Sequence, residues 1–179
     1  TKTHKSKPSE IREEIEAQLP RLGVDAIDFY HVWCIATLQT WRERKQDGVI
    51  ETFLKLKEEG LIRHICVSSH LIGEDIQELL REDIFEGVLF GYSASTFPFR
   101  EPAFKVIAER NLGAVVMNPL GGCVIPDHPD LFEFVKSRPE ETVVEAALRF
   151  LFAHEKISSV LVGYRDLDDL RGALRALDG

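Results

Sequence analysis

Apolar residues recur along the chain at two spacings, which predict alternating helices and strands. Positions 11, 15, 19 and 22 have helical spacing, and short β-branched runs between turn residues are typical of strands. The expected strands are 24–35, 61–70, 85–92, 113–118 and 157–162, with a stub at Thr1 and Lys2. The expected helices are 9–22, 49–59, 71–81, 100–111, 131–136, 140–154 and 167–177. We expect Pro20 to bend or end the first helix near Leu19, and 38–47 to form a polar loop with a helical turn.

Five expected strands each precede a helix, and repeated βα units build a parallel sheet with helices outside. Two α/β architectures fit this order: an open doubly wound sheet and a (β/α)8 barrel of the TIM type. No GxGxxG motif follows the first strand, which weakens the open dinucleotide-binding sheet. A barrel needs about 250 residues. The chain has 179, so a barrel would lack its N-terminal βα units. The length suits one domain over residues 1–179.

The composition excludes several classes of protein. A net charge of -8 and a pI near 5.3 argue against a nucleic-acid surface. No apolar run approaches the roughly 20 residues of a membrane span, and the polar start lacks the apolar core of a signal peptide. The three cysteines form no CxxC pair. We therefore expect reduced thiols in a cytoplasmic protein and no metal site.

The expected strand that runs into Ser68, Ser69 and His70 is the centre of the functional interpretation. Small polar residues at the carboxyl end of a buried parallel strand are typical of ligand sites in α/β proteins. Segment 163–165, Gly-Tyr-Arg, precedes the last helix, where barrels often hold a phosphate on a helix N-terminus. Arg165 is the natural anion partner there.

Several stretches, in order along the chain, resemble one enzyme family. They are 1–3 with 10–12 and 22–30, 56–63 with 67–70, 118–122, and 146–150 with 160–163. Together they resemble the aldo-keto reductase superfamily, in particular the branch often found with an iron–sulfur tail. The resemblance implies a (β/α)8 barrel that binds NADP or NAD without a Rossmann fold and moves a hydride between the nicotinamide and a small carbonyl substrate. The chain resembles the barrel from the end of its third strand onward, so the family's catalytic tyrosine and aspartate lie outside it.

The resemblance places Lys2 at the family's catalytic lysine, whose ammonium lowers the pKa of the tyrosine that protonates the alkoxide. Trp33 stands where the family has a catalytic histidine, and an indole cannot exchange a proton near neutral pH. His31 shares the strand face of Trp33 but lies about 6 Å short of that position. The alternative interpretations are a polar barrel-interior residue for His31 and a substrate-pocket wall for Trp33.

The resemblance also implies a cofactor site built from three segments. Two serines match a pair that binds the nicotinamide carboxamide, and a methionine takes the place of an aromatic that stacks on the ring. A glycine-containing loop matches the pyrophosphate loop, although Pro-Leu-Gly-Gly can also be a plain turn. The residues concerned are Ser68, Ser69, Met117, Asn118, Leu120, Gly122, Gly163, Tyr164 and Arg165. Several family contacts are lost. Leu89 replaces a glutamine, Asp169 replaces an arginine that can grip the 2′-phosphate, and Gly172 and Ala173 replace polar residues that hold the adenine.

Three functions remain open. The first is an aldo-keto reductase-like oxidoreductase, and the second is a catalytically impaired barrel of that family that binds a cofactor or partner. The third is another phosphate-handling barrel enzyme that uses 163–165. Open parallel edges would favour self-association. We interpret the acidic runs as solvated or helix-capping charges. They are Glu58, Glu59, Glu140, Glu141, Asp166, Asp168 and Asp169.

Overall fold

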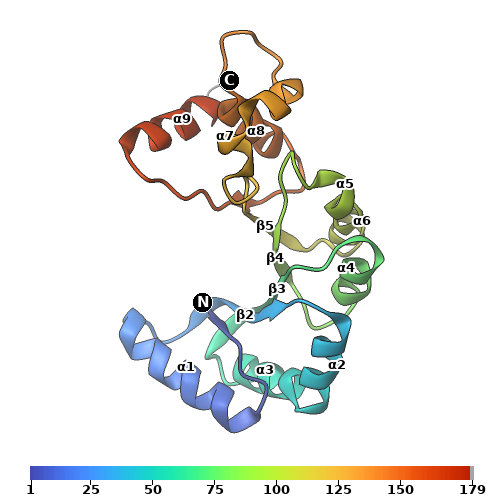
Figure 1. The fold of residues 1–179 in the computed structure, drawn as a ribbon. Coiled ribbons are helices and arrows are strands. Elements are labelled where there is room, and N and C mark those ends of the chain that lie inside the picture. Colours follow the sequence, from blue (N-terminus) through green and yellow to red (C-terminus); the bar gives the residue numbers. More distant parts are fainter. Residues whose placement is uncertain (178–179) are drawn as a thin grey trace.

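The computed structural model describes residues 1–177, which form a parallel sheet and its helices (Figure 1). The strands are β1 (Lys2–Thr3), β2 (Ile27–Ile35), β3 (Ile62–Ser69), β4 (Gly87–Gly91), β5 (Gly113–Met117) and β6 (Ser159–Val160). They lie in the order β1 to β6, each paired in parallel with the next. The helices are α1 (Pro8–Leu22), α2 (Leu38–Gln46), α3 (Val49–Glu58), α4 (Gly73–Leu80), α5 (Phe97–Arg100), α6 (Pro102–Arg110), α7 (Val124–Asp127), α8 (Val143–Phe152) and α9 (Leu167–Leu177), with a 3-10 helix at Pro129–Val135.

The molecule has the shape of an arc, with the helices along the outer side of the strands (Figure 1). Outward-facing strand residues such as Tyr30, Val67 and Phe90 are fully buried against helices. The alternate residues face the inner side, where Phe29 is 58% exposed and Trp33 is 37% exposed. Within the described chain, β1 and β6 each have one strand neighbour, so the sheet does not close on itself. This arrangement confirms the expected α/β fold of consecutive βα units and is that of an incomplete barrel.

The first helix differs from the prediction at both ends. It begins at Pro8 with Lys7 as N-cap, one residue before the Ser9 start that was expected. Pro20 does not end it near Leu19. The helix continues to Leu22, because the proline lies in the last turn, where its missing N–H removes only one hydrogen bond. The end is secured at Gly23, whose φ is 68°, where the N–H groups of 23 and 24 donate to the carbonyls of 20 and 19.

Two further segments differ from the sequence prediction. Segment 38–46 is the helix α2 rather than a polar loop, since Thr37 caps it through the N–H of Thr40 at 3.0 Å. Its one fully buried side chain, Trp41, donates to Glu82 at 2.8 Å. With only Leu38 and Trp41 apolar, the segment gives too weak a periodic signal to predict a helix. Strand β6 has two residues instead of the expected six, because only Val115 and Val116 of β5 pair with it.

Candidate functional site

A cleft of about 280 Å³ lies at the carboxyl ends of β5 and β6, between the loop after β5 and the segment before α9. Side chains of α8 and Asp169 of α9 complete its wall. Such a position suits a ligand site in a parallel α/β fold. Six of the residues predicted to bind the cofactor line this cleft: Asn118, Leu120, Gly122, Gly163, Tyr164 and Arg165.

The loop after β5 is a left-handed turn with free backbone donors. Asn118, Gly121, Gly122 and Cys123 all have positive φ, and the N–H of Gly121 donates to the carbonyl of Asn118 at 2.9 Å. A Cβ on Gly121 would lie 2.6 Å from Ser95 Oγ, so this position requires glycine. The N–H groups of Gly122 and Cys123 donate to no acceptor in residues 1–177. These two amides are therefore available to phosphate oxygens.

The opposite wall carries an ion pair. Arg165 Nε lies 3.0 Å from Asp169 Oδ2 and its Nη2 lies 3.2 Å from Oδ1, a fork that uses both carboxylate oxygens. Hydrogen bonds from Arg165 lower the pKa of Asp169, and the same bond raises the pKa of Arg165. The Arg165 guanidinium is largely exposed, but its charge is already paired with the carboxylate of Asp169. The predicted contact of Arg165 with an anion stays a prediction, and it would compete with Asp169.

Asp166 caps the N-terminus of α9, as the sequence predicts for this acidic run. Its Oδ1 accepts the N–H groups of Asp168 and Asp169 at 3.0 and 2.9 Å. The cap fixes the direction in which α9 leaves the cleft.

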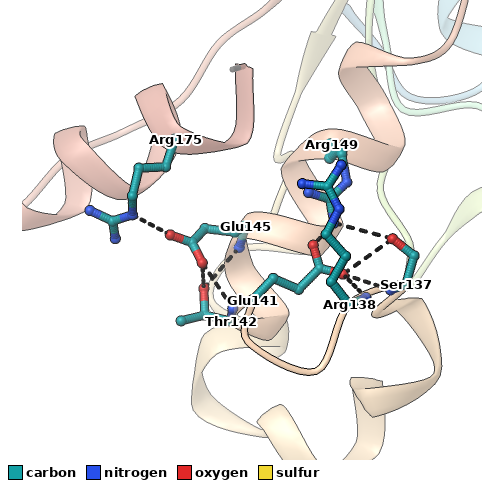
Figure 2. A network of polar contacts seen from close by, with 7 residues as sticks. All are labelled: Ser137, Arg138, Glu141, Thr142, Glu145, Arg149 and Arg175. Carbon is teal, nitrogen blue, oxygen red and sulfur yellow. Dashed lines mark hydrogen bonds and ion pairs between the residues drawn. The ribbon is translucent and has the colours of Figure 1, made fainter. Parts of the chain in front are cut away.

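Glu145 joins α8 to α9 (Figure 2). Its Oε2 accepts the backbone N–H and the hydroxyl of Thr142, while its own N–H donates to Thr142 Oγ1, which forms a capping box. Arg175 of α9 donates from Nε to Oε1 at 2.5 Å. Hydrogen bonding to the Thr142 backbone is the main cause that lowers the pKa of Glu145. This residue thus holds the two helices that frame the cleft.

Glu141 is buried, so the prediction that it is a solvated charge is wrong. Its side chain accepts the backbone N–H groups of Ser137 and Arg138 at 2.6 and 2.9 Å (Figure 2). It also forms an ion pair with Arg149 of α8, whose side chain is 20% exposed. The sequence shows Glu141 only as part of an acidic run. It does not show that this carboxylate accepts hydrogen bonds from the backbone of a loop. Glu140, the residue before it, is exposed, as predicted.

The three predicted catalytic residues lie on the inner side of β1 and β2, and the cleft lining includes none of them. The ammonium of Lys2 lies 4.6 Å from the centre of the Trp33 ring, a cation–π distance. His31 is half-buried, and its Nδ1 lies 3.1 Å from the carbonyl of Thr1. Burial lowers the pKa of His31 and favours the neutral imidazole.

The predicted nicotinamide contacts also lie outside the cleft lining. Ser69 is fully buried, and its hydroxyl donates to the carbonyl of Ile35 and accepts the N–H of Leu71. It therefore links the ends of β2 and β3 by hydrogen bonds. Ser68 is 1% exposed on the inner row of β3, and Met117 is half-buried at the end of β5.

Tyr92, which follows β4, lies in the core. It is 1% exposed and packs against Phe104 and Phe150. The aromatic ring is therefore on the helix side of the sheet and not on its inner side.

One residue near the strand ends received no role from the sequence. Arg100 is half-buried, and its guanidinium carbon lies 3.6 Å from the position that a Cβ on Gly91 would occupy. Gly91 and Arg100 are nine positions apart in the sequence, and no spacing rule connects them.

Among residues 1–177, no three histidine, cysteine or acidic side chains are grouped so that they could hold a metal ion. No helix in this described part combines the length and apolar character needed to cross a membrane.

The comparisons with known proteins agree on the family. The aldo/keto reductase family matches residues 1–178. The uncharacterized oxidoreductase YqkF of Bacillus subtilis (strain 168) is 24% identical over 190 residues, which is 93% of this chain and 60% of YqkF. The structure of aldo-keto reductase AKR11C1 from Bacillus halodurans in its holo form matches with a TM-score of 0.80 and 24% identity, over 100% of this chain and 65% of that one.

A third protein, the thermostable aldo-keto reductase Tm1743 in complex with the inhibitor epalrestat, matches with a TM-score of 0.77 and 17% identity over 99% of this chain and 64% of its own. The chain thus spans 60% to 65% of the length of these relatives. Because the family match extends over residues 1–178 and the consecutive parallel strands superpose on solved family structures, this chain belongs to the aldo/keto reductase family.

Proposed function

We propose that this chain carries the dinucleotide-binding part of an aldo-keto reductase-type oxidoreductase, which uses NADP or NAD to exchange a hydride with a small carbonyl or alcohol substrate. The cleft after β5 and β6 supports this most directly, since it joins two predicted cofactor segments. Its volume of about 280 Å³ is at the low end for ligand pockets, which suits part of a dinucleotide. The free thiols of Cys34, Cys66 and Cys123 support a reducing, cytoplasmic location.

The residues present fit the phosphate portion of such a cofactor. The N–H groups of Gly122 and Cys123 would hold phosphate oxygens, and Leu120 and Tyr164 offer apolar surface beside them. The nicotinamide, when bound, supplies the hydride. Lys2 is proposed as the lysine that holds down the pKa of a catalytic tyrosine from another part of the protein.

The second candidate is a catalytically impaired member of the family that binds a cofactor or partner. The observation that favours it is on β2: Trp33 stands at the family's histidine position, with the ammonium of Lys2 over its ring. His31, the nearest imidazole on that strand face, is tied to the carbonyl of Thr1. The Trp33 indole is only a hydrogen-bond donor, and burial shifts the pKa of His31 away from the charged imidazolium.

Turnover separates the two candidates. In the full-length protein, oxidation of NADPH and NADH is followed by loss of nicotinamide absorbance with a panel of aldehydes, ketones and quinones. The first proposal expects turnover with at least one carbonyl. Tight dinucleotide binding with no turnover across the panel supports the impaired barrel. Absence of dinucleotide binding contradicts the first proposal and leaves only an impaired barrel that binds a partner.

The ion pair at the cleft provides a test of cofactor choice. Asp169→Asn keeps the size of the side chain and frees Arg165 from its carboxylate. We expect NADPH affinity to rise about fivefold or more relative to NADH, because the guanidinium becomes available to a 2′-phosphate. Asp168→Asn is the matched control, since Asp168 pairs with Arg171 instead. Equal effects of the two variants in a fluorescence titration would show that the cleft does not hold the 2′-phosphate.

A further inference from the structure

Arg100 has no hydrogen-bond or ion-pair partner among residues 1–177. The residue is half-buried, and its Nη1 atom is shielded from solvent without an acceptor. Other half-buried arginines in the chain are satisfied: Arg44, Arg110 and Arg149 each donate to a carbonyl, a hydroxyl or a carboxylate. A guanidinium carries five donors and stays charged, so leaving one unpaired and partly buried is unfavourable.

The guanidinium lies on the inner side of the sheet. Phe90 faces the helices, where its ring contacts Phe104 of α6. The next residue, Gly91, therefore faces the inner side, and it pairs with Met117. The guanidinium carbon and Nη1 of Arg100 lie 3.6 Å from where a Cβ on Gly91 would be, so the glycine leaves room for them. Arg100 thus sits at the carboxyl ends of β4 and β5, the end where parallel barrels hold their ligands.

No carboxylate within the described chain, residues 1–177, neutralises this cation. Burial is the cause that lowers the pKa of Arg100, and no acidic residue acts in the opposite direction. The adjacent carboxylate, Glu101, is engaged by the hydroxyl of Tyr92 and lies 3.8 Å from His154. Among residues 1–177, no side chain supplies the negative charge that would complete the site.

We infer that Arg100 binds an oxyanion, a phosphate or a carboxylate, at the inner carboxyl ends of β4 and β5. The guanidinium fork matches two oxygens of either group. Two sources share this chemistry: the pyrophosphate of a dinucleotide and the carboxylate of a carbonyl substrate. The existence of the site needs only the geometry above, whereas the choice between these sources rests on the proposed function.

The test is isothermal titration of the full-length protein with inorganic pyrophosphate and, separately, with pyruvate. We expect Arg100→Met to weaken binding of at least one of these anions about tenfold or more. Arg63→Gln removes the same charge at the other end of the sheet, where Arg63 is 66% exposed and pairs with Asp28, and should leave binding unchanged. Wild-type protein that binds neither anion, or Arg100→Met that binds both as tightly as wild type, would overturn the inference.

Thermal unfolding separates a binding role from a structural one. Removing an unpaired, partly buried charge should leave the Tm of Arg100→Met equal to or above that of wild type. A clear fall in Tm would indicate that the guanidinium holds the fold together, which would contradict the inference.

The two sources are told apart by a further titration with NADH. Weaker NADH and pyrophosphate binding in Arg100→Met, with pyruvate unaffected, identifies the cofactor pyrophosphate. Weaker pyruvate binding with unchanged NADH affinity identifies a substrate carboxylate. If wild-type protein binds no dinucleotide, the proposed function fails, while loss of anion binding in Arg100→Met still supports the site.

Discussion

Replacing Glu141 by alanine should strongly destabilise the region that carries the cleft wall. The side chain is 8% exposed, accepts two backbone N–H groups and pairs with Arg149. Each orphaned N–H costs about 1–3 kcal/mol, and breaking a buried ion pair costs about 3–5 kcal/mol. These contributions overlap because one carboxylate makes all the contacts. We therefore expect Glu141→Ala to lower the free energy of unfolding by about 3–5 kcal/mol.

The assay is urea unfolding followed by circular dichroism at neutral pH. Glu141→Gln keeps an amide oxygen for the loop N–H groups but loses the charge. We therefore expect it to lower the free energy of unfolding by about 1–3 kcal/mol. Glu140→Ala is the matched control, because its exposed side chain makes no hydrogen bond or ion pair in residues 1–177, and should stay within about 0.5 kcal/mol of wild type. In the double variant with Arg149→Met, the loss should be smaller than the sum of the single losses. Equal destabilisation by Glu140→Ala and Glu141→Ala would refute the reasoning.

Three further predictions concern backbone strain, acid stability and thiol reactivity. In urea unfolding, Gly121→Ala should destabilise by about 2 kcal/mol or more and Gly122→Ala by about 1 kcal/mol. Both glycines have a φ of 66°, but only a Cβ at 121 would also clash with the hydroxyl of Ser95. Equal losses in stability would show that the clash does not matter. Burial raises the pKa of Glu86, but hydrogen bonds from a lysine, a histidine and a backbone N–H outweigh it and bring the pKa to about 2. Its stabilisation is therefore complete above its ordinary value of 4.5 and is lost as the pH falls towards 2, so Glu86→Gln should flatten thermal stability across that window, and an unchanged slope would count against it. Burial raises the pKa of Cys66 to about 12, so iodoacetamide should modify exposed Cys123 and spare Cys66 in peptide mass spectrometry of the native protein.

The order of the elements could be predicted from the sequence because each βα unit carries its own periodic signal. The helix over Leu167–Leu177 has the predicted bounds, and the strand that ends at Ser69 is in its expected place. Helix α2 was missed because its polar surface hides a single buried tryptophan. Strand ends were the least accurate, since pairing with a neighbouring strand sets them.

The candidate site could be predicted only in part. Chain order and family resemblance indicated the residues that line the cleft, because loops after neighbouring parallel strands meet at one end of the sheet. The pairing of Arg165 with Asp169 follows the i, i+4 spacing and could have been found from the sequence. The burial of Glu141 and the position of Arg100 beside Gly91 depend on how loops fold back, which no local pattern records.

The strictly consecutive strand order bears on how the protein is made. Each strand of the described chain needs only the strand synthesised just before it as a template, so the sheet can grow at one edge while the ribosome is still translating. The cleft, by contrast, needs α8, β6 and α9, which are synthesised after β5. A nascent chain halted after β5 can therefore already pair these strands, while the cleft cannot form until α9 has been synthesised.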